Sequence, residues 1–377
     1  MEYVFWISFG VVLYAYVGYA ALAIGFGRLF TRGVGRGTYE PAVSILTAAR
    51  NEATRIAATI ENKVRLDYPR DKLQIIVVSD ASTDDTDRIA RAAGDDRVMV
   101  LRQEPQRGKT AALNLAVTRA TGEVLVFADA NSIYGADAIR MLVRNFQDPQ
   151  VGYVTGRLIY GDVAGAGLGC SLYMTYEDML SRAETNFGSI VGVNGGIDAV
   201  RKSLYVSMRD EQLPDFVLPL DVVRRGYRVV YEPAALLRED SLTTSGAEYR
   251  MRVRVALRAW WTLTEMRELF DVRRYGLFSI QLFSHKALRY LAFAALPPLY
   301  LSAATLQSAG WFYRASFLAG SALLLLAAAG HVVERLGRSN RIVSLPYYFV
   351  VINAAAAHAL VSFLRGRRQT VWTPRLG

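Results

Sequence analysis

The stretches LQIIVVSD (residues 73–80) and EVLVFADAN (residues 123–131) decide the fold. Both are nearly continuous apolar runs, and amphipathic stretches separate them from similar runs at residues 42–49 and 98–101. Strands that are apolar on both faces and alternate with helices indicate a mostly parallel sheet covered on both sides. The sequence therefore predicts an α/β domain.

Oxygen-bearing side chains stand at the ends of the two quoted strands. Asp80 ends the first strand, and Asp129 ends the second, two residues before Asn131. Parallel sheets bind ligands at the carboxyl ends of their strands. Because side chains alternate along an extended segment, Asp129 and Asn131 point to the same side, and Mg²⁺ or Mn²⁺ prefers such oxygen ligands. Capping or turn formation explains an Asp-x-Asn standing alone equally well.

The loops after the strands carry helix-start signals. Ser82–Thr86 reads as a loop that caps a helix at 87–93. Arg107-Gly108-Lys109 opens a further helix, where backbone amides beside a cation favour an anionic ligand. The spacing of an ATP-binding P-loop is absent, and no Gly-x-Gly-x-x-Gly follows the first strand, which disfavours an ATPase and a dinucleotide-binding domain.

The charge and the hydrophobic residues together indicate a membrane protein. The 377 residues include 52% hydrophobic residues and carry a net charge of +10. Tyr3–Gly27 contains no charged residue and exceeds the roughly 20 residues that a membrane helix needs, and arginines follow it. Arginines on the cytoplasmic side of membrane helices account for the surplus charge, so we expect no nucleic-acid partner. A single cysteine, Cys170, and three scattered histidines disfavour disulfides and structural zinc.

Apolar segments return near the C-terminus. Three of them lie at Tyr290–Tyr313, Ala315–Val333 and Ile342–Leu364, after an arginine- and tryptophan-rich region at 247–274 that is typical of helices in the membrane interface. If all three span and the middle of the chain is cytosolic, the basic stretch Arg365–Arg368 ends outside, against the positive-inside tendency. The stretch containing Pro346 is therefore our candidate for a re-entrant segment.

These patterns predict a multi-pass protein of the cytoplasmic (inner) membrane whose α/β domain faces the cytosol. The expected parts are an N-terminal transmembrane helix (1–30), the α/β domain (38–245), amphipathic interface helices (246–285), two or three transmembrane or re-entrant helices (287–365) and a basic tail (366–377).

Several motifs occur in a fixed order along nearly the whole chain. They are ARNE (49–52), SDASTD (79–84), RGK (107–109), FADAN (127–131), Gly192–Val200, Pro214–Leu220, Arg225–Pro233 and VWTP (371–374). In this order they resemble the membrane-embedded family 2 glycosyltransferases, which include the synthases of hyaluronan, chitin, cellulose and poly-N-acetylglucosamine. The resemblance implies a GT-A domain followed by interface and membrane helices.

The resemblance also implies roles for single residues on the donor side. Asp80 would hold the uridine end of a UDP-sugar, with Arg50, Glu52 and Lys109 in the nucleotide pocket. Asp129 would act on the diphosphate through Mg²⁺ or Mn²⁺, assisted by Asn131.

On the acceptor side, Asp215 matches the general base of inverting transferases, and a cap at the start of the following helix is its plainer interpretation. Asp221, the other nearby acid, would face elsewhere on that helix. Relatives often have a second acid where this chain has Pro214.

The Gln-x-x-Arg-Trp stretch of processive synthases retains only its arginine here, as Arg254, which would meet the diphosphate. Trp260 is a candidate for stacking on the acceptor sugar, or an anchor in the membrane interface. Asn194 is a candidate acceptor contact, or part of a glycine-rich turn without a ligand.

The main hypothesis is an inverting, metal-dependent hexosyltransferase that extends a β-linked polysaccharide from a UDP-sugar at the lipid bilayer. Export would need a second copy or a partner chain, because the membrane segments are few. The close alternative is a transferase that adds one sugar to a lipid-linked acceptor. A catalytically inactive membrane subunit would lack the strand-end acids, and Asp80, Asp129 and Asp215 argue against it.

Overall fold

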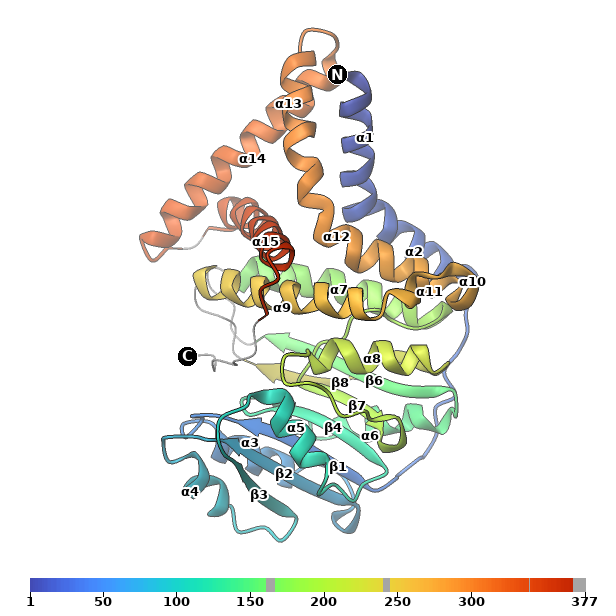
Figure 1. The fold of residues 1–377 in the computed structure, drawn as a ribbon, viewed down its shortest axis with the longest axis vertical. Helices are drawn as coiled ribbons and strands as arrows, with labels where there is room; N and C mark the ends of the chain where they lie inside the picture. The colour runs from blue at the N-terminus through green and yellow to red at the C-terminus, as the bar shows by residue number, and fades with distance from the viewer. Residues whose placement is uncertain (161–166, 240–244, 339, 369–377) are drawn as a thin grey trace.

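The structure is a computed structural model that describes all residues except 161–166, 240–244, 339 and 369–377. The VWTP motif at 371–374 lies outside the described residues. Figure 1 shows three levels along the long axis: a sheet domain, a layer of helices that run across the axis, and helices that run along it at the N-terminal end.

The described residues contain one eight-stranded sheet with the order β3-β2-β1-β4-β7-β6-β8-β5. Its strands are β1 Val43–Ala49, β2 Leu73–Asp80, β3 Val98–Gln103, β4 Val124–Asp129, β5 Ile133–Tyr134, β6 Val151–Tyr160, β7 Ile197–Arg201 and β8 Arg228–Glu239. The first four strands in this order are parallel, as are β6 and β8, whereas β7 runs antiparallel to both of its neighbours. This arrangement confirms the expected α/β sheet. In its register Ala48 pairs with Asp129 and Ala49 with Ser79, so the strand ends that carry Asp80 and Asp129 lie at one edge.

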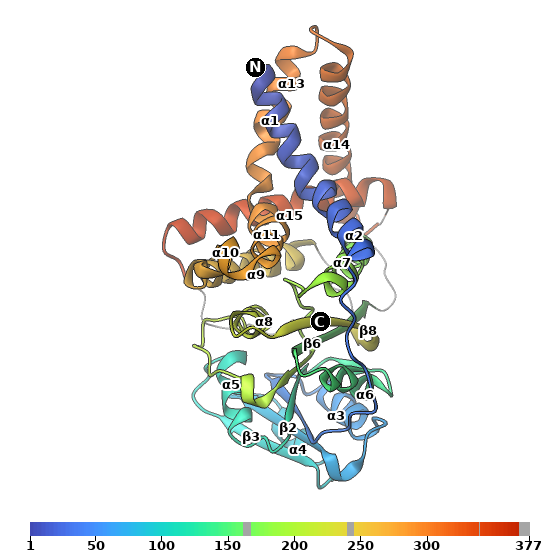
Figure 2. The same ribbon diagram turned by 90° about the vertical axis from the view of Figure 1, so that its right-hand side faces the viewer.

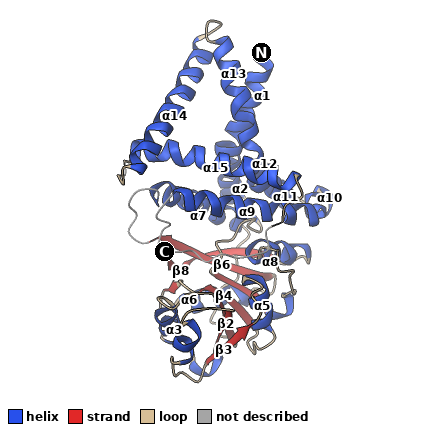
Figure 3. Ribbon diagram, turned by 60° about the vertical axis from the view of Figure 1, so that its left-hand side comes forward, coloured by secondary structure: helices blue, strands red, loops and turns tan. Residues whose placement is uncertain are grey.

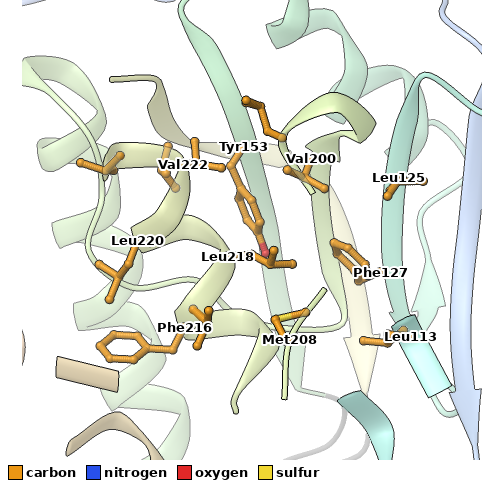
Figure 4. Close-up of a cluster of buried hydrophobic side chains, with 14 of the residues drawn as sticks. Leu113, Leu125, Phe127, Tyr153, Val200, Met208, Phe216, Leu218, Leu220 and Val222 are labelled. Atoms are coloured by element: carbon orange, nitrogen blue, oxygen red, sulfur yellow. The ribbon is translucent and has the colours of Figure 1, made fainter. Parts of the chain in front are cut away.

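Helices cover both faces of the sheet. They are α3 Ile56–Val64, α4 Thr86–Arg91 and α6 Ala138–Val143 on one face, and α5 Lys109–Val117 and α8 Pro214–Arg224 on the other. Because strand side chains point alternately to the two faces, each face has its own hydrophobic core. Ile45 and Val126 pack in the first core, on the face of α6, and Leu46 and Phe127 pack in the second core, on the face of α5 and α8. Figure 4 shows the second core, where Leu218 of α8 packs near Tyr153 of β6. Burying one such leucine contributes about 1.5–3 kcal/mol, and this contact fixes α8 on the sheet.

Long helices form a crosswise layer above the domain (Figure 2). The layer contains α7 Gly167–Phe187, α9 Ser245–Glu265 and α15 Arg341–Leu364, with the short α10 Val272–Tyr275, α11 Leu277–Leu282 and α12 Leu288–Leu291 beside them. Helix α15 packs on α9 through a cluster that includes Ala256, Leu257 and Ala359. Figure 3 also shows α15 running across the long axis, next to α9.

The third level contains α1 Glu2–Leu13, which continues through a π-helical turn (Tyr14–Gly18) into α2 Tyr19–Leu29, together with α13 Leu296–Leu306 and α14 Trp311–Arg335. Helix α13 contacts both α1 and α14. Within the described residues, three helices are long and apolar enough to cross a membrane: Glu2–Leu29, α14 and α15. The expected segment Tyr290–Tyr313 ends earlier, at Leu306, because the turn before Gly310 interrupts the helix and α14 starts at Trp311.

The basic stretch after α15 returns to the sheet domain. The Trp261 indole donates a hydrogen bond to the Arg367 carbonyl (3.0 Å), and the Arg368 guanidinium pairs with Glu211 (3.0 Å). Arg368 also lies 4.5 Å from the centre of the Trp261 ring. The crosswise course of α15 thus leaves Arg367 and Arg368 on the same side of the helical layer as the sheet.

Candidate active site

A cavity lies between the carboxyl ends of β1 and β4 and the helices α8 and α9. It brings together seven of the residues that the sequence singled out: Glu52, Lys109, Asp129, Asn131, Asn194, Asp215 and Arg254. Arg258, which the sequence did not single out, also lines it. Arg50, Asp80 and Trp260 do not line it, and the contacts of each explain why.

Arg50 joins the loops that follow β1 and β2. Its guanidinium donates to the carbonyls of Asp80 (2.7 Å) and Ala81 (3.1 Å). The Glu52 amide donates to the Thr86 hydroxyl (2.8 Å), and the Glu52 side chain is buried at the cavity wall. Arg50 therefore supports the strand-end loops and so the position of Glu52.

Asp80 is fully buried beneath the loop that carries Lys109. Its carboxylate accepts the backbone amides of Arg107 and Gly108 (both 2.9 Å) and the Gln103 amide (2.5 Å). Gly108 has φ +95°, a conformation that a side chain would strain. Asp80 thus fixes the start of α5 and the direction of Lys109.

Lys109 and Asp129 form an ion pair in the cavity, with 2.5 Å between Nζ and Oδ1. Burial alone lowers the pKa of Lys109, but Asp129, Asp215 and Asp198 outweigh it and hold that pKa above its ordinary value. The carboxylate of Asp129 therefore already faces a cation. One carboxylate with the nearby Asn131 amide fits Mg²⁺ or Mn²⁺, which complete their coordination with water and phosphate oxygens.

Asp215 lies in the first turn of α8, where Pro214 takes the first helical position. A Cβ atom on Gly195, whose φ is +65°, would lie 2.8 Å from the Asp215 Oδ2 atom. Asn194 holds the same loop, because its amide donates to the Gly156 carbonyl (2.6 Å). The glycine thus leaves room for the Asp215 carboxylate in the cavity.

Arg254 and Arg258 enter the cavity from α9, one helical turn apart. Arg258 is only 8% exposed, and burial together with the charge of Arg254 lowers its pKa, while Asp215 and Glu211 act in the opposite direction. Two guanidiniums on one wall favour a ligand with phosphate oxygens. The sequence signal that could have identified Arg258 was its position four residues after Arg254, which places both residues on one face of a helix.

Asp198 of β7 is a second residue that the sequence reasoning missed. It is 1% exposed, and burial, with a smaller effect of the Asp215 charge, raises its pKa to about 7, although hydrogen bonds from Thr155 and Tyr153 act against this. The only signal in the sequence was a carboxylate among the apolar residues at 197–200.

Trp260 packs between helices and does not line the cavity. Its ring stacks on Phe363 of α15 (6.0 Å between centres) and lies 6.0 Å from the Tyr290 ring. Asp221 is buried and pairs with Arg224 and Arg225, so it faces away from the cavity, as its position on α8 suggested.

This sheet and cavity define the class of the domain. Residues 44–167 match the family "Glycosyl transferase family 2", so the chain carries a family 2 glycosyltransferase domain with a GT-A fold. The expected recognition and fold are thereby confirmed.

Two curated relatives resemble the chain over this region and beyond. The poly-beta-1,6-N-acetyl-D-glucosamine synthase of Staphylococcus aureus (strain COL) is 30% identical over 224 residues, which are 57% of this chain and 53% of the relative. The probable glycosyltransferase YdaM of Bacillus subtilis (strain 168) is 30% identical over 229 residues, 57% of this chain and 54% of the relative. The chain thus matches about half the length of these relatives.

A solved structure resembles nearly the whole chain. The mannosyltransferase PcManGT from Pyrobaculum calidifontis, in complex with GDP-Man and Mn²⁺, superposes with a TM-score of 0.73 and 23% sequence identity. The match covers 97% of this chain and 99% of that one, so the likeness in fold includes the helices outside the GT-A domain.

Proposed function

We propose that the protein is a membrane-bound glycosyltransferase that transfers a sugar from a UDP-sugar to a growing β-linked polysaccharide, with inversion at the anomeric carbon. The observation that carries the proposal is the single cavity that contains Asp215, the Lys109–Asp129 pair, Arg254 and Arg258. The named relatives are a polysaccharide synthase and a probable glycosyltransferase, which supports the same activity.

The cavity separates the charges that such a transfer requires. Lys109, Arg254 and Arg258 stabilise the negative charge that develops on the leaving diphosphate. Asp129 and Asn131 would hold Mg²⁺ or Mn²⁺, which supplies further charge neutralisation there when bound. Asp215 accepts the proton of the acceptor hydroxyl as that oxygen attacks the anomeric carbon opposite the leaving group.

On the donor side we propose two kinds of role. Glu52 and Lys109 contact the nucleotide directly because they line the cavity. Arg50 and Asp80 act as positioning residues, since their hydrogen bonds join the loops around the cavity. A direct contact between Asp80 and uridine, which the family resemblance implies, would replace one of the three bonds that its carboxylate accepts.

For the membrane, we propose that three helical segments span the bilayer: Glu2–Leu29, the continuous helical run from α12 through α13 (Leu288–Leu306), and α14. Helix α15 lies in the cytosolic interface of the bilayer. The cytosolic side then contains the sheet domain, the arginines that follow Gly27, and the pair Arg367 and Arg368. This arrangement agrees with the positive-inside tendency. In a Cys170→Ser background, Ser308→Cys should react with an impermeant thiol reagent on intact cells, and Arg367→Cys only after permeabilisation. External labelling of Arg367→Cys would reverse the proposed orientation.

The activity is tested by nucleotide release from purified protein with a panel of UDP-sugars and GDP-mannose, each with Mg²⁺ or Mn²⁺. Release with a UDP-sugar that Asp215→Asn abolishes supports the proposal. Release with GDP-mannose alone would replace the proposed donor, and release that persists in Asp215→Asn would contradict the proposed base.

A second candidate is the addition of one sugar to a lipid-linked acceptor. It is favoured by Trp260, which packs on Phe363 and Tyr290 and does not face the cavity where an acceptor sugar would stack. The size of the product under excess donor separates the two candidates, because a synthase yields long chains and a single-addition enzyme yields one uniform product.

A further inference from the structure

A second cavity lies on the adjacent face of α9, above the catalytic cavity. Met251, Arg254 and Arg258 line the catalytic cavity, whereas Arg252 and Ala256 line this one. Val255 lines both, because at 100° per residue it falls between the two helical stripes. Val255 therefore lies at the boundary between the second cavity and the catalytic cavity.

Helices from distant parts of the chain meet at this interhelical cavity. Besides α9, it is lined by the π-helical turn after α1, by α7, by α12 and by α15. The Tyr16 hydroxyl of the turn donates to the Asn353 side chain of α15 (2.8 Å), which joins the two ends of the chain at the cavity. Figure 1 shows α7, α9, α12 and α15 gathered where the crosswise layer meets the helices that run along the long axis.

One end of the interhelical cavity is cationic and aromatic. The Arg252 guanidinium lies 4.6 Å from the centre of the Tyr173 ring, and Arg289 lies 5.3 Å from the same ring. Glu248 orients Arg252 (2.8 Å), and Glu177 orients Arg289 (2.5 Å), but neither carboxylate lines the cavity. Its described lining thus contains two guanidiniums and no acid, a combination that favours phosphate oxygens.

The other end of the cavity is apolar. Val255 and Ala256 of α9 face Ile352 and Ala356 of α15 across it, and small side chains leave the space between the helices open. Because α15 lies at the level proposed for the membrane interface, this end is suited to a hydrocarbon chain. A free sugar or free phosphate would leave the apolar wall unused.

We propose that the interhelical cavity binds the phosphate headgroup of a lipid-linked acceptor between Arg252 and Arg289. The hydrocarbon chain leaves along the apolar wall of α15, and the sugar of the acceptor reaches past Val255 to Asp215. The inference rests on the proposed transfer in the catalytic cavity, and it concerns the second candidate, in which one sugar is added to a lipid-linked acceptor.

The test measures binding directly, so that it does not depend on turnover. The 377-residue protein in detergent is titrated with a short-chain polyprenyl phosphate, with inorganic phosphate, and with nanodiscs that contain phosphatidylglycerol. We expect saturable binding of polyprenyl phosphate, with an affinity at least tenfold higher than that for inorganic phosphate. Nanodiscs that contain phosphatidylglycerol but no polyprenyl phosphate should bind at least tenfold more weakly as well. Nucleotide release is measured separately, so a failure of the proposed function is recognised independently of this binding.

Two kinds of variant locate the binding. Arg252→Lys and Arg289→Lys keep a positive charge opposite Glu248 and Glu177 but remove the planar guanidinium that can donate two parallel hydrogen bonds to a phosphate. Each substitution should weaken binding about tenfold. Ala356→Leu fills the apolar wall without touching an ion pair and should weaken it as much. Arg273→Lys on α10 and Ala354→Leu on the exposed face of α15 are the matched controls, since neither residue lines the cavity.

Each outcome decides the proposal. Weaker binding in the three cavity variants, with unchanged controls and unchanged thermal midpoints, supports it. If inorganic phosphate binds as tightly as polyprenyl phosphate, the hydrocarbon chain is not recognised and the proposed lipid ligand is wrong. If phosphatidylglycerol binds as tightly, the cavity binds membrane phospholipid and the proposed acceptor is wrong. Binding that Ala356→Leu leaves intact places the ligand outside the interhelical cavity and overturns the site.

Discussion

The two walls of the catalytic cavity are built differently. The lower wall consists of strand ends and the start of α5, where Lys109 and Asp129 form an ion pair. Asp80, beneath this wall, holds the loop before Lys109 through two backbone amides. The upper wall consists of side chains on α8 and α9, and α9 packs on α15 in the crosswise layer. The lower wall thus belongs to the sheet domain, whereas the upper wall is shared with the crosswise helical layer.

This difference assigns the two walls to different partners. The lower wall belongs to the sheet domain, and it is where we propose that the nucleotide donor binds from solution. The upper wall connects the reacting groups Asp215, Arg254 and Arg258 to helices that contact the proposed bilayer, and it therefore suits an acceptor held in the membrane. Substitutions of Asp215 and of the lower wall should therefore separate transfer from donor binding, whereas Arg254 and Arg258 contact the diphosphate of the donor from the upper wall.

The largest effect is expected at Asp215, on the upper wall. Asp215→Asn removes the proposed base but keeps the size of the side chain, so kcat should fall by about 10²–10⁴-fold while donor affinity stays within about twofold. Initial rates and equilibrium binding of the donor measure the two quantities. Asp96→Asn, at an exposed position in the same domain, is the control. A kcat above a tenth of the wild-type value would remove Asp215 from the mechanism.

On the lower wall, Asp129→Ala should act through the metal and the donor. We expect the rate to fall by about 10²-fold and the dependence on Mg²⁺ or Mn²⁺ to shift to higher concentration, because one ligand and the partner of Lys109 are lost. Rates are titrated with each metal after chelation of the wild-type protein and the variant. Full activity of the chelated wild-type protein would contradict the proposed metal site.

The two arginines of α9 allow a sharper comparison within the upper wall. Arg254→Gln and Arg258→Gln should each lower kcat/KM by about 10–100-fold, since each removes a charged hydrogen bond to the diphosphate. If both bind the same diphosphate, the double variant should lose less than the product of the single effects. Arg250→Gln on the exposed side of α9 is the control. Strict multiplicativity would mean that the two residues act on different groups.

The smallest effect on transfer, and a measurable one on stability, is expected at Asp198. Its pKa is about 7 in the folded chain against 3.8 for the unfolded group. The folded state therefore keeps a proton that the unfolded state releases, so the stability that Asp198 contributes is full below about pH 4 and is lost as the pH rises toward 7. Asp198→Asn should raise the thermal midpoint at pH 8 by about 5–10 °C and change it little at pH 4.

The control for this variant is Asp96→Asn, whose carboxylate is exposed and should change neither midpoint. The measurement is a thermal scan of detergent-solubilised protein at both pH values. An equal shift at pH 4 and pH 8 would show that the stabilisation does not come from the proton.

The sequence by itself determined the lower wall. The runs 73–80 and 123–131 formed strands within one or two residues of the predicted bounds, and their terminal carboxylates lie at one edge because parallel strands end together. These features are local, since apolar period, turn residues and strand length are written within a few neighbouring residues. The long apolar segment that follows Glu2 is local in the same sense.

Only the tertiary structure decided the upper wall and the course of the C-terminal helices. Arg258 lines the same cavity as Asp215, Trp260 stacks on Phe363, and Arg368 pairs with Glu211. The two residues of each pair are 43 to 157 positions apart in the sequence. The crosswise direction of α15 follows from its packing on α9, and hydrophobicity along one segment carries no information on its direction in space. Contacts between distant segments depend on which surfaces fit together, and that choice is made only when the whole chain packs.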